Sequence, residues 1–137
     1  IHETCPGTTI ETLISDMKGN TDALDIVIAS HPEVLNHNVE TVKELQSAVR
    51  PQARYERSLE VLRYCKKKDS TLLTKTGCMV GLGENEEQIS ALMDDILDTG
   101  CDILTIGQYL QPSPQHYPLA RSSYKAWEVL EGSHDLY

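Results

Sequence analysis

Apolar residues recur three and four positions apart in four stretches of the chain, which is the spacing of one buried face of a helix. The residues that form these stripes are Ala23, Leu24, Val27, Ile28, Leu45, Ala48, Val49, Tyr55, Leu59, Leu62, Cys65, Ile89, Leu92, Met93, Ile96 and Leu97. Pro51 and Gly100 stand where the second and fourth stretches end, because proline cannot continue a helix and glycine favours its C-terminal cap. The pattern therefore predicts four amphipathic helices.

Three of these stretches begin with a side chain that can cap a helix. Asn20 precedes the first stretch and can accept a hydrogen bond from a backbone N–H of the first turn. Thr41 with Glu44, and Asn85 with Gln88, have the spacing of a capping box, in which each side chain bonds to the backbone of the other residue. We therefore expect helices directly after Asn20, Thr41 and Asn85.

Short β-prone runs separate the helices, at residues 9–14, 34–39, 72–80 and 102–106. Strands that alternate with amphipathic helices are typical of βαβ units, in which the strands form a parallel sheet. No linker or low-complexity stretch divides the chain. The pattern predicts one α/β domain with four parallel strands.

Polar residues occupy alternate positions in three of these runs, although parallel strands covered by helices on both faces are apolar throughout. Glu11, Asn36, Asn38, Glu40 and Lys75 are expected on one face, opposite the apolar residues that pack on the helices. This arrangement predicts a partial (βα) TIM-like barrel with a polar interior. A complete barrel takes about 250 residues, so we expect about half of one.

The formal net charge of −9 argues against nucleic acid as a partner, because phosphates bind clustered Lys and Arg. The basic run Lys66–Lys68 lies at the end of the third helix, where cations interact favourably with the helix dipole. No run of 18 apolar residues is present, so no membrane association is expected. Cys5, Cys65, Cys78 and Cys101 are widely spaced, which excludes a local C-x-x-C metal loop and indicates a reducing compartment.

The segment Gly81–Glu84 joins a strand to a helix, as a phosphate-binding loop would. Glu84 and Glu86 would repel phosphate at that helix N-terminus. Two interpretations remain open from these residues. The segment is either a tight turn that needs glycine, or a place where the backbone approaches a neutral adenine ring.

Other residues carry weaker signals. Lys75 could form a Schiff base, as in barrel aldolases, although it lies early in its strand and away from the C-terminal rim where barrel chemistry is found. His37 falls on the apolar face of its strand and is interpreted as a structural histidine. Ser122 and Ser123 lack the Gly-x-Ser-x-Gly elbow of serine hydrolases.

Several longer motifs, taken together and in this order, resemble the lipoyl synthase family. They are NHNVET at 36–41, VRP at 49–51 with Tyr55, TKTG at 74–77, MVGLGE at 79–84, LTIGQYLQP at 104–112 and RSSYKA at 121–126. They cover most of residues 8–126, and their shared order makes the resemblance specific.

The resemblance implies a partial barrel of the radical S-adenosylmethionine (SAM) type with two [4Fe-4S] clusters. In that family one cluster, held by a C-x-x-x-C-x-x-C loop, cleaves SAM, and the resulting radical abstracts hydrogen from a protein-bound octanoyl chain. The second cluster is consumed as the sulfur donor that makes the lipoyl group. Implied partners are octanoylated lipoyl-carrier proteins (2-oxoacid dehydrogenase E2 domains and the glycine cleavage H protein) and an electron donor such as ferredoxin or flavodoxin.

The resemblance also implies individual site residues. Those that match positions facing the SAM nucleoside or lining its cavity are Asn38, Glu40, Arg50, Lys75, Gly81 and Gly83. Among them, Asn38 and Glu40 match the ribose motif, and the two glycines match the turn beside the adenine. Ser123, with Arg121 adjacent, matches the serine that ligates the auxiliary cluster.

The chain departs from the family pattern in three respects. Both cysteine motifs are absent from it, Ser15 stands where the family usually has proline, and a stretch before the RSSYKA motif is missing. We therefore expect residues 1–137 to be the C-terminal part of a radical SAM barrel domain, with 118–137 a truncated cluster-ligating tail. The expected localisation is the bacterial cytoplasm, with the mitochondrial matrix as the alternative.

These departures bear on function. The expected parent protein is a lipoyl synthase, and this chain by itself is expected to be inactive. One alternative is a non-catalytic barrel fragment or regulatory product. The other is a lysine-dependent, aldolase-like barrel enzyme, for which Lys75 would be the nucleophile.

Overall fold

The computed structural model describes residues 1–120 of the chain, so Arg121 and Ser123 lie outside the described residues. Its centre is a four-stranded sheet whose strands follow one another in chain order and pair in parallel throughout. The strands are β1 Glu11–Leu13, β2 Val34–Asn36, β3 Leu73–Val80 and β4 Ile103–Gln108. The predicted parallel α/β sheet is therefore confirmed.

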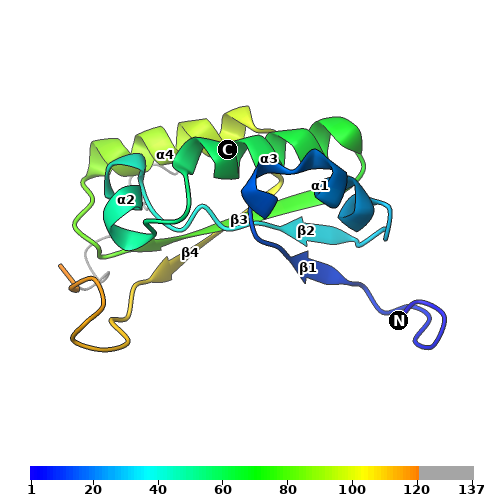
Figure 1. Cartoon of the computed structure of the whole chain (residues 1–137), viewed down its shortest axis with the longest axis horizontal. Coiled ribbons are helices and arrows are strands. Elements are labelled where there is room, and N and C mark those ends of the chain that lie inside the picture. Colours follow the sequence, from blue (N-terminus) through cyan, green and yellow to red (C-terminus); the bar gives the residue numbers. More distant parts are fainter. Residues whose placement is uncertain (121–137) are drawn as a thin grey trace, which may run out of the picture.

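Helices connect the strands, and α1, α3 and α4 all lie on one side of the sheet (Figure 1). The connecting elements are the 3-10 helices η1 Met17–Gly19 and η2 Lys43–Leu45, and the helices α1 Thr21–Ile28, α2 Gln46–Val49, α3 Tyr55–Lys68 and α4 Glu86–Asp98. Within the described residues no helix covers the other face of the sheet. The arrangement is that of an opened half-barrel with its helices outside.

Two clusters of buried side chains join the helices to the covered face of the sheet. The first contains Val39, Val42, Tyr55, Leu59, Leu62, Cys78, Leu92 and Ile96. The second contains Leu24, Ile28, Leu35, Val61, Cys65 and Leu72. Helix α3 contributes to both clusters and so links α1 to α4. Most members belong to the apolar stripes that the helical periodicity identified.

Two of the three predicted helix caps are present. The Asn20 side chain accepts hydrogen bonds from the first turn of α1, at 3.0 Å from the Asp22 amide nitrogen. Asn85 and Gln88 form a full capping box at α4, each side chain lying 2.9 Å from the other residue's amide nitrogen. Both helices therefore start where the sequence placed them.

The third predicted cap, at Thr41, is wrong. Thr41 is buried, and its hydroxyl makes no hydrogen bond among residues 1–120. The chain forms the 3-10 helix η2 first, with Val42 as its N-cap residue and no side-chain cap. Burial of Val39 and Val42 draws this segment into the core, and α2 ends at Val49 before Pro51. The capping-box spacing was overridden by tertiary packing.

The predicted alternation of the strands is confirmed. Leu35 lies in the core under the helices, so its neighbour Asn36 belongs to the opposite, open face. On that face the Lys75 ammonium of β3 reaches across to the Glu11 carboxylate of β1, at 2.9 Å. Among the described residues β1 and β4 each pair on one side only, so both are edges of the half-barrel.

Candidate functional site

The ion pair between Lys75 and Glu11 and the Asn36 amide form a polar network on the open face. Besides the Lys75 bond, Glu11 Oε1 accepts a hydrogen bond from Asn36 Nδ2, at 2.9 Å. The bonds from Lys75 and Asn36 lower the pKa of Glu11 below its ordinary value. Lys75 donates to both carboxylate oxygens, whereas an amine must lose its proton before it attacks a carbonyl. The geometry gives Lys75 a structural contact and does not favour aldolase chemistry.

Glu40 stands just beyond the C-terminal end of β2 in a left-handed conformation, with φ 76°. Its amide nitrogen donates to the Gly77 carbonyl at 2.9 Å, and its carbonyl accepts from the Met79 amide at 2.8 Å. A residue with a Cβ pays about 1–2 kcal/mol for this conformation. The two bonds to β3 hold the strained backbone in place and direct the carboxylate towards Arg50, whose Nη1 lies 3.5 Å from Glu40 Oε1.

A cavity of about 250 Å³ opens beside this ion pair. It is lined by Leu13, Ile14, Ser15, His37, Asn38, Glu40 and Arg50. Its volume is near the lower end of ligand pockets, about 300 Å³. Asn38 and Glu40, predicted to face the nucleoside, and Arg50, predicted to line its cavity, thus all border one cavity at the C-terminal end of β2.

A larger cavity of about 760 Å³ lies next to it and shares Ser15, His37 and Arg50 with it. Arg57 of α3 crosses to the segment before η1, where its Nε donates to the Asp16 carboxylate at 2.6 Å. Sequence reasoning missed this pair, because the partners come from different elements and neither belongs to a periodic stripe. The pair fixes the wall of the larger cavity.

His37 is buried between the two cavities. One ring nitrogen, Nδ1, lies 3.0 Å from the Ile14 carbonyl oxygen, and Nε2 has no partner among the described residues. Burial lowers the pKa of His37 below its ordinary value, and the Ile14 contact opposes that shift. The interpretation of His37 as a structural histidine fits this environment, although only one of its nitrogens is satisfied.

The Gly81–Glu84 turn binds its own glutamate. The buried Glu84 carboxylate accepts from the Gly81 amide at 2.6 Å and from the Leu82 amide at 2.9 Å. Gly81 and Gly83 have φ of 104° and 113°, which residues with a Cβ rarely adopt. Both amides are therefore engaged, so the turn is not a phosphate loop and its glycines are required by conformation.

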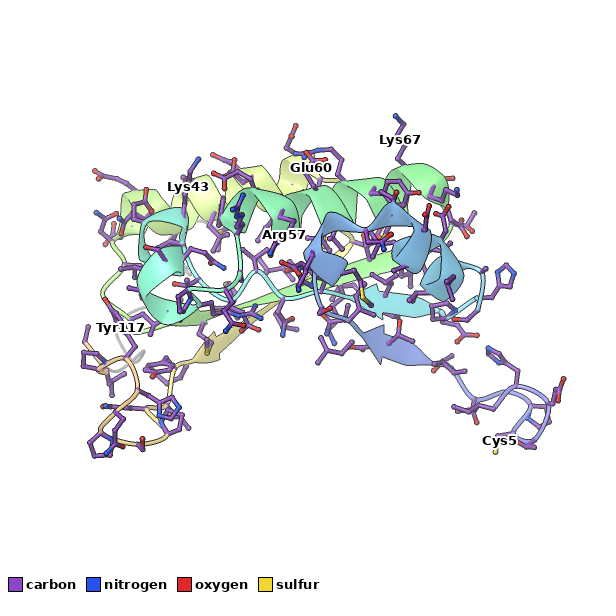
Figure 2. All side chains as sticks on the ribbon, in the orientation of Figure 1. Cys5, Lys43, Arg57, Glu60, Lys67 and Tyr117 are labelled. Atoms are coloured by element: carbon purple, nitrogen blue, oxygen red, sulfur yellow. The ribbon has the colours of Figure 1, made fainter. Side chains whose placement is uncertain are left out.

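The cysteines of residues 1–120 do not fit an iron–sulfur cluster as they are placed. Cys5 is exposed on the N-terminal turn, away from the sheet (Figure 2), whereas Cys65 and Cys78 are buried in the core. Burial raises the pKa of both core thiols to about 11, although cluster ligands are thiolates. Residues 1–120 contain no group of three or more Cys, His, Asp or Glu side chains that could hold a metal ion.

Comparisons with known proteins show the family to which the chain is similar. The Radical SAM superfamily profile matches residues 1–96. The lipoyl synthase of Rubrobacter xylanophilus is 55% identical over 121 residues, which are 88% of this chain and 38% of that protein. The mitochondrial lipoyl synthase of Nematostella vectensis is 55% identical over 114 residues, 83% of this chain and 39% of that protein. The chain thus spans about two fifths of the length of these relatives.

A solved structure shares the fold. It is coproporphyrinogen III oxidase from Escherichia coli, described as a radical SAM enzyme, with a TM-score of 0.67 over 91% of this chain and 31% of that one. At 17% identity the likeness concerns the fold alone.

No helix in the described part of the chain has the length and apolar character needed to cross a membrane.

Proposed function

This chain belongs to the radical SAM superfamily, and from that premise we propose that it forms the nucleoside-facing part of the barrel of a lipoyl synthase. The observation that carries the proposal is the meeting of Asn38, Glu40 and Arg50 at one cavity on the open rim of the sheet. These are residues that resemble the family's nucleoside motifs. The identity of about half the residues to named lipoyl synthases supports the same assignment.

The chemistry of these side chains suits a ribose. Carboxylate and carboxamide oxygens accept hydrogen bonds from vicinal hydroxyls, and an amide NH₂ donates to them. The Glu40 side chain is 24% exposed, so its carboxylate is within reach of a ligand although it is paired with Arg50. In the proposed role Asn38 and Glu40 bind the ribose hydroxyls, and Arg50 orients Glu40. In the same proposal Gly81 and Gly83 lie by the adenine, whereas Lys75, which is paired with Glu11, does not line the 250 Å³ cavity.

Radical SAM enzymes as a class use SAM with a [4Fe-4S] cluster, and the cluster supplies the electron that cleaves SAM. In this proposal the chain supplies residues for the nucleoside, whereas its described cysteines do not fit the cluster, so the sulfurtransferase activity is proposed for the longer protein alone. We assign to that protein the octanoylated carrier proteins as substrates and ferredoxin or flavodoxin as electron donor. Its proposed compartment is the bacterial cytoplasm, with the mitochondrial matrix as the alternative; one similar protein is named as mitochondrial.

The tail belongs to the same proposal. Residues 118–137 are proposed as a shortened form of the family's cluster-ligating segment, with Ser123 as the ligand and Arg121 beside it. In the family such a serine acts together with three thiolates. It would therefore contribute only within a protein that supplies those thiolates.

A non-catalytic barrel fragment is the second candidate for the chain itself. It is favoured by the absence of both cysteine motifs from these 137 residues.

A nucleoside titration separates this candidate from a nucleoside-binding chain. Uniformly ¹⁵N-labelled chain is titrated with adenosine, and we expect amide shifts at Asn38, Glu40 and Gly81 that Asn38→Ala abolishes. Glu11→Gln, on the same face but away from the cavity, is the control, and an unperturbed spectrum would refute the nucleoside role.

A further inference from the structure

Gly77, within β3, has no room for a side chain unless its neighbours move. A Cβ at this position would lie 2.9 Å from Asn38 Oδ1 and 2.9 Å from Thr105 Oγ1, closer than the 3.0 Å that real Cβ atoms essentially always keep. The φ of Gly77 lies outside the left-handed region, so a Cβ there is opposed by these two side chains and not by backbone conformation, and at least one of them would have to shift. Two polar side chains therefore converge on the one position of β3 that lacks a side chain.

These side chains come from opposite sides of β3. Asn38 belongs to the segment that follows β2, and Thr105 is paired with Gly77 in the register of β4. The Thr105 hydroxyl donates to the Thr76 carbonyl at 3.3 Å, which fixes its oxygen beside Gly77. The Asn38 carboxamide thus lies across β3, bounded by Thr105.

The backbone around Asn38 is held in place by β3. The His37 amide donates to the Lys75 carbonyl at 3.0 Å, and the Val39 amide donates to the Thr76 hydroxyl at 3.2 Å. The Asn38 carboxamide itself makes no hydrogen bond to any other residue between 1 and 120. Polar side-chain groups that are partly buried are normally hydrogen-bonded, and the Asn38 carboxamide is an exception. Its NH₂ group and its oxygen are therefore available to a ligand on the open face.

We infer that Gly77 and Thr105 are positioning residues that hold the Asn38 carboxamide across β3, in the orientation in which it meets the ligand. The identity of that ligand as a nucleoside rests on the proposed function, whereas the positioning of Asn38 does not. Gly77 provides the space for the amide, and Thr105 limits its movement towards β4. Neither residue needs to touch the ligand.

The sheet contains a matched control for Gly77. Gly107 of β4 is exposed on the same face, paired with Met79, and a Cβ there would meet nothing within 4 Å. Gly77→Ala and Gly107→Ala therefore add the same methyl group to the same face, with a collision in one case only. Thr105→Ala, on the edge strand, is a second test variant in case Gly77→Ala does not fold, and Thr105→Ser restores the hydroxyl.

The experiment follows the side-chain NH₂ resonances of Asn38 in ¹⁵N-labelled full chain, assigned by their loss in Asn38→Asp. Gly77→Ala and Thr105→Ala should shift these resonances, whereas Gly107→Ala and Thr105→Ser should leave them near their wild-type positions. Loss of one neutral hydrogen bond should also raise the Kd for adenosine by roughly tenfold or less in Gly77→Ala.

Different results would refute the positioning role of Gly77 and Thr105 and the proposed nucleoside function. Asn38 resonances that stay in place in Gly77→Ala, or move equally in Gly107→Ala, would overturn the positioning role. If Gly77→Ala does not fold, unmoved resonances in Thr105→Ala overturn it. A wild-type chain that does not bind adenosine would refute the nucleoside function, and the Asn38 resonances would still decide the positioning role.

Discussion

Arg50 reaches back from the end of α2 to Glu40, so that its Nη1 lies 3.5 Å from Glu40 Oε1 at the rim of the open face. Glu40 is already fixed at its backbone by two hydrogen bonds to β3. The guanidinium is therefore a second anchor, which acts on the carboxylate alone. Both residues line the 250 Å³ cavity, so the contact sets the direction in which the carboxylate faces a ligand.

Arg50→Met should weaken adenosine binding several-fold while changing the free energy of unfolding by only about 0–1 kcal/mol, since the pair is partly exposed. Isothermal titration and urea unfolding measure the two quantities. Lys43→Met is the matched control, because it removes a more exposed ion pair, with Glu56, on the outer helices. Equal adenosine binding by wild type and Arg50→Met would show that Arg50 does not orient Glu40.

Glu84 should be a major stabilising residue of the chain. Glu84→Gln leaves one oxygen to accept where the carboxylate accepted from two amides, and it presents an NH₂ group to the other amide. A buried charge-assisted network of this kind should cost about 2–4 kcal/mol when broken. The control is Glu87→Gln, an exposed residue of the first turn of α4, which should cost a few tenths of a kcal/mol. Urea unfolding of the three proteins tests the difference.

The order of strands and helices could be predicted from the sequence because the apolar face of each helix has to pack against the apolar face of the sheet. The apolar face of α3 meets Leu35 and Val39, so their neighbours Asn36 and Asn38 must lie on the other face. Thr41 shows the limit of this reasoning. Its capping-box spacing is local information, whereas its burial depends on Val39 and Val42 packing against helices that come later in the chain.

The candidate site was predictable only in part. Asn38 and Glu40 were expected on the open face from the alternation of side chains along the strand. The left-handed φ of Glu40 could not be predicted, because glutamate is not a residue type that favours this conformation. The crowding at Gly77 was also invisible, because it depends on the register that places Thr105 beside it. Lys75 was expected to line the same cavity as Asn38, and it is instead paired with Glu11.

His37 should make the chain less stable in mild acid. Burial lowers the pKa of His37 in the folded chain below 6.5, while the unfolded chain keeps the ordinary value. The unfolded state then binds more protons as the pH falls through 6.5, so stability contributed by the neutral ring is present above that pH and lost below it. His37→Gln should flatten the dependence between pH 7.5 and about 5. Urea unfolding at several pH values measures this dependence of the free energy of unfolding. The same dependence in wild type and His37→Gln would show that His37 does not cause it.

A polypeptide of these 137 residues should not assemble an iron–sulfur cluster. Clusters require several thiolates held around one site. Here Cys65 and Cys78 are buried thiols with pKa values raised to about 11, and Cys5 is exposed on a separate turn. Ser123 is the one residue that matches a family ligand, and a serine alkoxide cannot replace the missing thiolates.

Anaerobic reconstitution with iron and sulfide tests this prediction directly. We expect no stoichiometric visible absorption, no cluster signal in electron paramagnetic resonance, and no product from an octanoyl-lysine peptide supplied with SAM and a reductant. A variant in which all four cysteines are replaced by serine should give the same background as the wild type, which distinguishes adventitious iron from a built site. Stoichiometric cluster incorporation that depends on any of those cysteines would show that the fold opens to bring them together, and the chain would then carry chemistry of its own.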